Sequence, residues 1–229
     1  MGIMIGSGNR DSLIEQLTRR RYTVGVDLGQ TVDPTAICVL ERADIPALEI
    51  GQVLDPNAVP YKITRQVRHL ERLPLQTPYP KQVWHIGRML ATAPLSSGAS
   101  LVIDHTGVGK PVFDIFTKAS MKPIGITITA GDKWSGSGRE FRVPKLLLVS
   151  RLQRDFHEGN LKIAKSLPEA QVLANELQDF KVSYSPNTGH ARFGAREGRH
   201  DDLVLALAIA CWFDDHRSRN AITVSEFAI

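Results

Sequence analysis

The sequence predicts an α/β domain whose mixed sheet has three antiparallel N-terminal strands followed by parallel strands, flanked by helices. Three observations lead to this class. Short connections join three strand-like segments near the N-terminus, which favours antiparallel pairing. Helical and strand-like segments then alternate, and the last long helix is apolar on every side. At 229 residues the chain can form one substantial core, so we expect one principal domain.

Turn signals at Asp33-Pro34 and at 44–46 separate the three N-terminal strands. A polar segment, Asp11–Arg21, precedes them and predicts a short helix or arm that ends in three arginines. We therefore divide the chain into an N-terminal arm (1–21), a main domain (22–217) and a C-terminal tail (218–229). The expected strands are Tyr22–Leu28, Thr35–Glu41 and Ala47–Leu54.

The rest of the chain alternates between the two kinds of element. The proline-rich stretch LPLQTPYP separates the first two expected helices, and Pro144 occupies a favoured first-turn position. A glycine-rich stretch with basic flanks, Ala130–Arg142, predicts a loop or hairpin. The expected elements are helices at Tyr61–Arg72, Gln82–Ala93, Pro111–Ser120, Pro144–Glu158, Pro168–Phe180 and Asp201–His216, strands at Ser100–Asp104 and Pro123–Thr129, and a hairpin of Lys181–Ser185 with His190–Gly194.

Composition excludes several classes of protein. A net charge of +4 is weakly basic and compatible with a polyanionic partner. Cys38 and Cys211 are isolated, which argues against structural zinc or a disulfide framework and fits a reducing cytosol. The longest apolar run, Leu203–Phe213, is too short to cross a bilayer, and the N-terminus lacks signal-peptide features. We expect a cytoplasmic protein with no membrane partner.

Four aspartates stand at the ends of apolar elements. Asp27 ends the first strand and Asp104 ends another, each followed by a glycine-containing turn. Asp201 and Asp202 begin the last helix, where one aspartate suffices as a cap. Ligands gather beyond strand ends in sheets of this kind, so we expect the four carboxylates to face one site. As isolated residues, each is more often a turn or cap residue than a ligand.

Such a cluster of carboxylates must take up protons or bind cations, because carboxylates about 4 Å apart repel by roughly 4 kcal/mol at an effective dielectric near 20. Oxygen ligands suit Mg²⁺ or Mn²⁺ rather than zinc. Two such ions would support hydrolysis of a phosphodiester. Adjacent helical residues point about 100° apart, so Asp201 and Asp202 are not expected to be equal ligands.

Three segments, in this order, resemble the nuclease domain of phage large terminase subunits, a member of the ribonuclease H-like superfamily: VGVDLGQTVDPTAICVLE, LVIDHTGVGKPVFDIF and RHDDLVLALAIACW. The resemblance spans about Tyr22–Phe213, and its last motif is the most specific. It implies metal-dependent endonuclease cleavage of concatemeric double-stranded DNA during viral genome packaging. It assigns the catalytic and metal-binding roles to Asp27, Asp104 and Asp202 or Asp201.

The resemblance also implies partners: a terminase ATPase motor, the portal and the small terminase subunit, in the cytoplasm of a host cell. No GxxxxGK[ST] phosphate loop occurs, and TGVGKP lacks its spacing. We therefore expect either an excised nuclease domain or a stand-alone relative.

Basic residues supply candidate DNA contacts. Arg65, Arg68 and Arg72 would share one face of the expected Tyr61–Arg72 helix, where they could follow phosphates or simply be solvated. The stronger candidates lie on or beside the glycine-rich segment: Lys133, Arg139, Arg142 and Lys145.

Three other functions remain open. A junction resolvase of the same superfamily would nick four-way junctions symmetrically. An actin-like or Hsp70-like nucleotide-binding module is suggested by GVDLGQT, but it would require two lobes and a longer chain. A catalytically silent DNA-binding subunit would bind DNA without cutting it.

Overall fold

The computed structural model describes residues 3–55, 59–107, 109–179, 181–184, 191–194 and 201–226. Its centre is an eight-stranded mixed sheet in the order β10-β5-β3-β2-β6-β7-β9-β8. Strands β2, β3 and β5 pair antiparallel, whereas β6, β7 and β9 continue from β2 in parallel. The predicted fold class is therefore confirmed. The strands of this sheet are β2 (Arg19–Asp27), β3 (Ala36–Pro46), β5 (Tyr61–Arg72), β6 (Ser100–Asp104), β7 (Ile124–Thr129), β8 (Ser135–Ser137), β9 (Glu140–Pro144) and β10 (Leu161–Ile163).

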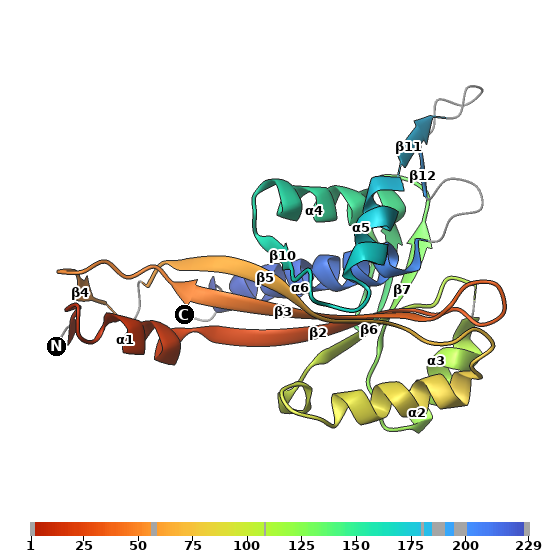
Figure 1. Cartoon of the computed structure of the whole chain (residues 1–229), viewed down its shortest axis with the longest axis horizontal. Helices are drawn as coiled ribbons and strands as arrows, with labels where there is room; N and C mark the ends of the chain where they lie inside the picture. The colour runs from red at the N-terminus through yellow and green to blue at the C-terminus, as the bar shows by residue number, and fades with distance from the viewer. Residues whose placement is uncertain are drawn as a thin grey trace.

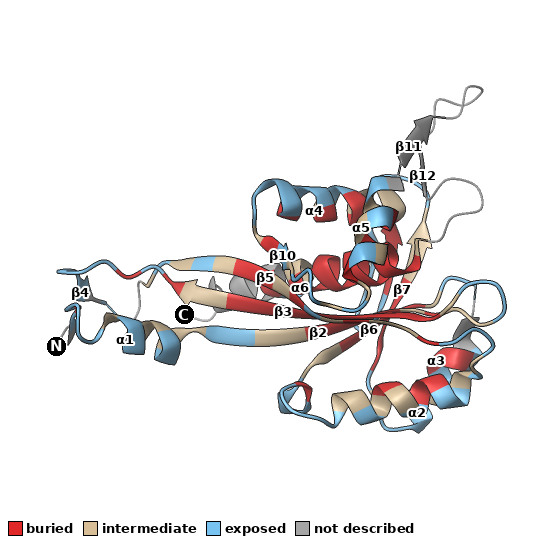
Figure 2. Ribbon diagram, viewed as in Figure 1, coloured by how far each residue is buried: buried red, intermediate tan, exposed pale blue. Residues whose placement is uncertain are grey.

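Helices cover both faces of this sheet (Figure 1). Helices α2 (Tyr79–Leu90) and α3 (Gly109–Lys118) lie on one face, and α4 (Lys145–His157), α5 (Ala170–Asp179) and α6 (Asp202–Glu226) lie on the other. Each face has its own apolar core. Every residue from Leu203 to Phe213 is buried, which confirms the expectation from its all-round apolarity (Figure 2). None of the described helices combines the length and apolarity needed to cross a bilayer.

The N-terminal end of β2 and the connected ends of β3 and β5 extend away from the main body as a long ribbon (Figure 1). Helix α1 (Arg10–Leu17) and the pair β1 (Ile3–Met4) and β4 (Val53–Leu54) lie at its tip. A small core around Ile5 and Leu48 holds this tip together. Because β2 begins at Arg19, the end of the expected arm is part of the sheet. Because α6 continues to Glu226, the expected tail begins within a helix.

Two expected elements are wrong. The segment Tyr61–Arg72 is the strand β5, not a helix, and it pairs with β3 over nearly its whole length. The third antiparallel strand is therefore β5, while only Val53–Leu54 of the expected strand Ala47–Leu54 is extended and paired. A bulge in β5 explains the misleading periodicity. It changes the register between Val39 and Leu40, so Val67 and Leu70 face the same core three positions apart.

The glycine-rich segment is a hairpin, β8–β9, whose second strand joins the sheet parallel to β7. The pair β11 (Lys181–Tyr184) and β12 (Ala191–Gly194) forms the other expected hairpin.

Candidate active site

Asp27 and Asp104 end two adjacent strands and are direct partners in the parallel pairing of β2 with β6. Their side chains lie at the carboxyl ends of these strands, as expected. Asp201 and Asp202 reach the same place from the N-terminus of α6. All four carboxylates line one pocket of about 400 Å³, together with residues 28–34, Tyr79, Thr106 and Leu205. The structure therefore brings the four predicted acidic residues together.

Gly25 allows α6 to lie directly on β2. A Cβ atom at this position would be 2.1 Å from the backbone oxygen of Ala206, a separation that real atoms do not reach. Gly29 allows the chain to turn sharply after Asp27, since its Cβ would be 2.1 Å from the backbone oxygen of Asp33. The atoms that pass close to Gly29 are therefore backbone atoms of Asp33 and Pro34. Both glycines help to place Asp27 and the start of α6 at one pocket.

Burial and neighbouring negative charge raise the affinity of Asp27 for a proton. Burial raises the pKa of Asp27 well above its ordinary value, and the negative charges of Asp104, Asp202 and Asp201 raise it further. Burial also raises the pKa of Asp104, although hydrogen bonding to Thr106 partly opposes this. The Thr106 N–H donates to Asp104 Oδ1 at 2.8 Å. Such mutual repulsion is relieved by protons or by a bound cation.

Two cationic side chains stand beside the pair of helix-start aspartates. Lys145 Nζ donates to Asp201 Oδ2 at 2.8 Å, and Arg72 Nη2 lies 3.5 Å from Asp202 Oδ2. Asp202 is buried, whereas Asp201 is only half-buried. The two aspartates thus differ in burial and in their cationic neighbour. Asp201 pairs with Lys145 of α4, whereas Asp202 lies beside Arg72 of β5.

Another acidic residue, Glu176, holds the start of α6 in place but does not line the pocket. Glu176 of α5 pairs with Arg72, and its Oε2 accepts the backbone N–H of Val204 at 3.0 Å. Arg72 was expected on the face of a helix at 61–72 and not beside the acidic residues, and no local pattern indicated Glu176. The pocket loop 28–34 and Tyr79 were also missed as site residues.

The geometry of the acidic pocket bears on its ability to hold a metal ion. Among the described residues, no group of three or more His, Cys, Asp or Glu side chains has the geometry to hold a metal ion as it stands. The donor set nevertheless suits a hard divalent cation, since four carboxylates share one pocket and repel each other.

The four predicted DNA-contacting residues are spread over the neighbouring part of the sheet. Lys145 lies beside the carboxylates. Arg142 is exposed on β9. Across the sheet, Asp104 pairs with Ile126, which in turn pairs with Phe141. Arg142 therefore lies one residue further along its strand than Asp104. Lys133 is exposed in the loop between β7 and β8. Arg139 is exposed at the other end of the hairpin, where its backbone oxygen accepts the N–H of Gly125 at the start of β7.

The other three arginines do not form a phosphate-contacting helical face. Arg65 is buried and its guanidinium contacts Asp214 and Asp155 at 2.8 and 3.5 Å. Arg68 pairs with Glu41, and Arg72 pairs with Glu176 and Asp202. Their positions on a strand rather than a helix explain this difference.

No protein-family model and no curated protein matches the chain, but several solved structures share its fold. The large terminase nuclease from thermophilic phage G20c with bound magnesium is 19% identical, with a TM-score of 0.55, over 84% of this chain and 81% of that one. The same nuclease with bound cobalt is 18% identical, with a TM-score of 0.52, over 84% of this chain and 81% of that one. The human cytomegalovirus terminase nuclease domain, soaked with manganese, is 11% identical, with a TM-score of 0.50, over 92% of this chain and 89% of that one. The chain therefore has the ribonuclease H-like fold of large terminase nuclease domains.

Proposed function

We propose that this chain is a metal-dependent DNA endonuclease that cuts concatemeric viral DNA during genome packaging. One observation carries the proposal: Asp27, Asp104, Asp201 and Asp202 line a single pocket in a fold shared with terminase nucleases. These residues come from β2, β6 and α6, so only the folded chain assembles them. A purely structural role would not require four carboxylates to converge at the mouth of a buried helix.

Mg²⁺ or Mn²⁺, in a pair, is the proposed cofactor. Asp27 and Asp104 would hold the ions with Asp202, and Asp201 would complete or support the set. Bound ions of this kind promote attack by water and stabilise negative charge on a scissile phosphodiester. The G20c structures with magnesium or cobalt and the manganese-soaked cytomegalovirus domain support divalent cations as the class of cofactor.

The chain's own residues orient the site and its substrate. Lys145 balances the charge of Asp201 in the metal-free state and is near enough to the pocket to approach a phosphate. Exposed Lys133, Arg142 and Arg139 provide sequence-independent attraction to the backbone of double-stranded DNA. Cutting should accordingly show little sequence preference and strong sensitivity to salt.

The proposed setting is the packaging machinery in an infected cell's cytoplasm. An ATPase motor, a portal and a small terminase subunit are the proposed partners, because the structural neighbours are terminase nucleases. The described part of the chain supplies the cutting site of such a machine.

Cleavage of supercoiled plasmid tests the proposal. The purified chain would be assayed with Mn²⁺, Mg²⁺ or EDTA, alongside Asp27→Asn, Asp202→Asn and the exposed control Asp11→Asn. We expect metal-dependent nicking and linearisation by the wild type and the control, and loss of at least about a hundredfold in the two site variants. Binding of DNA without any cleavage in either metal would instead identify a silent DNA-binding subunit. Symmetric nicking of four-way junctions in preference to linear duplex would favour a resolvase.

A further inference from the structure

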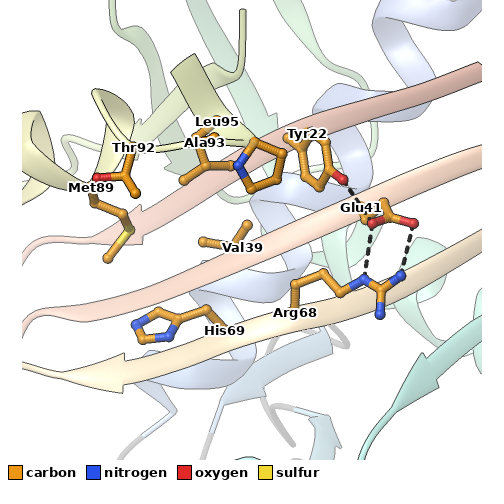
Figure 3. A pocket seen from close by; sticks show the side chains of 10 residues that line it. Tyr22, Val39, Glu41, Arg68, His69, Met89, Thr92, Ala93 and Leu95 are labelled. Atoms are coloured by element: carbon orange, nitrogen blue, oxygen red, sulfur yellow. Dashed lines mark hydrogen bonds and ion pairs between the residues drawn. The ribbon is translucent and has the colours of Figure 1, made fainter. Parts of the chain in front are cut away.

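A second pocket of about 520 Å³ lies against the sheet face that carries α2, between β2, β3 and β5 and the segment that follows α2 (Figure 3). It shares no lining residue with the acidic pocket. Tyr22, at its edge, precedes Asp27 by five positions on β2, which corresponds to roughly 16 Å along a strand. The two pockets are therefore separate sites.

The bulge in β5 gives this pocket two neighbouring basic side chains. Val39 pairs with His69 and Leu40 pairs with Val67, which leaves Arg68 as the extra residue. Since Val67 and Leu70 both face the core beneath α6, the bulge directs Arg68 and His69 together toward the opposite face. Bulges commonly re-aim side chains in this way beside functional sites.

Hydrogen bonds fix the polar wall of the pocket (Figure 3). Arg68 donates from Nε and Nη2 to the two carboxylate oxygens of Glu41, at 2.9 and 3.0 Å, and the Tyr22 hydroxyl donates to the same carboxylate at 2.9 Å. The Glu41 side chain is only 6% exposed, whereas that of Arg68 is 49% exposed. The buried carboxylate thus holds the half-exposed guanidinium of Arg68 in a fixed position at the edge of the pocket.

His69 is held in a similar manner. Its Nε2 lies 3.1 Å from Glu71 Oε2, which also contacts His85, and the His69 side chain is 44% exposed. The carboxylates of Glu41 and Glu71 are therefore the less accessible partners in both pairs. The more exposed polar groups at the pocket are therefore the Arg68 guanidinium and the His69 imidazole.

The remaining wall is apolar. Val39 forms part of the floor, while Met89, Ala93, Pro94 and Leu95 close the side formed by the end of α2 and the following turn. A cavity of this size, mostly apolar and with a few convergent polar groups, is typical of small-ligand sites. Met89 provides a polarisable thioether that suits an aromatic ring.

We propose that this pocket binds a small organic anion with a flat apolar body. The anionic group lies at Arg68 and His69, and the ring packs against Val39, Met89 and Leu95. Both an aromatic carboxylate and a nucleoside monophosphate have this chemistry.

Ligand-observed NMR and calorimetry on the full chain in EDTA test the proposal, since EDTA keeps metal-dependent binding at the acidic pocket out of the measurement. The probes are 1-naphthoate and AMP, with adenosine and inorganic phosphate as half-ligands. We expect at least one ring-bearing anion to bind, and we expect the affinity of each half-ligand to be lower by at least about tenfold. Preference between naphthoate and AMP identifies the source of the anion. If neither binds more tightly than about 1 mM, the proposal is overturned.

Three variants locate the site. Arg68→Gln removes the exposed charge, and Thr92→Trp fills the opening from an exposed position without disturbing Glu41. Each should weaken binding about tenfold or more, while Asp27→Asn in the acidic pocket should leave it unchanged. Circular dichroism confirms folding of each variant. Binding that survives in folded Thr92→Trp, or that disappears in Asp27→Asn, would place the ligand elsewhere and refute the assignment.

Discussion

Glu176 caps the start of α6 from a neighbouring helix, because its Oε2 accepts the backbone N–H of Val204 at 3.0 Å. The same carboxylate pairs with Arg72, whose Nη2 lies 3.5 Å from Asp202 Oδ2. A strand, a helix and the helix that carries Asp202 are thereby joined at the edge of the acidic pocket. The position of Asp202 consequently depends on residues that are remote from it in sequence.

Replacing Glu176 with alanine should destabilise the protein by about 1–3 kcal/mol, because the buried Val204 N–H loses its acceptor and Arg72 loses its carboxylate partner. Urea unfolding measures this change. Gln178→Ala, an exposed substitution on the same helix, is the matched control and should cost less than about 0.5 kcal/mol. Equal stability of the two variants would show that the cap contributes nothing.

The acidic site was predictable because its residues end strongly patterned elements. Ser100–Asp104 is an uninterrupted apolar strand, and the helix after Asp202 is apolar on every side, so both positions followed from local sequence. Their meeting with Asp27 required only that strand ends and a buried helix start converge. Arg72, the cationic residue beside Asp202, reaches the site through tertiary contacts that local sequence does not indicate.

Strand β5 was mispredicted for a physical reason. Its arginines are spaced as on a helix face, yet Arg65 is buried against Asp214 and Asp155, which lie 149 and 90 positions away. Ion pairs of this separation cannot be read from neighbouring residues. The bulge at Arg68 then removes the simple alternation by which a strand is normally identified.

The buried ion pairs of Arg65 supply a second prediction. Asp214 Oδ2 contacts Arg65 Nη2 at 2.8 Å and Arg42 Nη1 at 3.4 Å, and all three side chains are buried. Asp214→Ala should cost about 3–5 kcal/mol, because two buried cations lose a shared partner. Asp11→Ala breaks an exposed pair and should cost less than about 1 kcal/mol. Thermal and urea unfolding measure the loss of stability in both variants. Similar losses in the two variants would contradict this prediction.

Gly25 should tolerate no side chain. In Gly25→Ala the new Cβ would meet the Ala206 backbone oxygen at 2.1 Å, so α6 must move away from β2. We expect a loss of about 1–3 kcal/mol or more, together with weaker metal binding as the start of α6 shifts relative to Asp27. Gly8→Ala, which meets nothing within 4 Å, is the control. A Gly25→Ala protein with wild-type stability would contradict the tight packing of α6 on β2.

Asp27→Asn should stabilise the metal-free protein while abolishing the proposed cleavage. Burial and the neighbouring carboxylates raise the pKa of Asp27, so the folded state holds this proton at a higher pH than the unfolded chain does. The wild type therefore loses stability as the pH rises from about 4, the unfolded value, through the folded pKa of Asp27. The asparagine variant lacks this loss, and in EDTA at pH 7 we expect it to be more stable by on the order of 1 kcal/mol.

The sign of this difference distinguishes a binding site from a structural carboxylate. In EDTA the stability gap between Asp27→Asn and the wild type should vanish near pH 4 and widen toward pH 7, as measured by urea unfolding at each pH. Adding Mg²⁺ should reverse the order, because an ion bound only by the folded wild type adds stability that the variant cannot gain. If Asp27→Asn were instead less stable than the wild type at pH 7 in EDTA, Asp27 would be stabilising the fold, and the strain expected of an assembled carboxylate site would be absent.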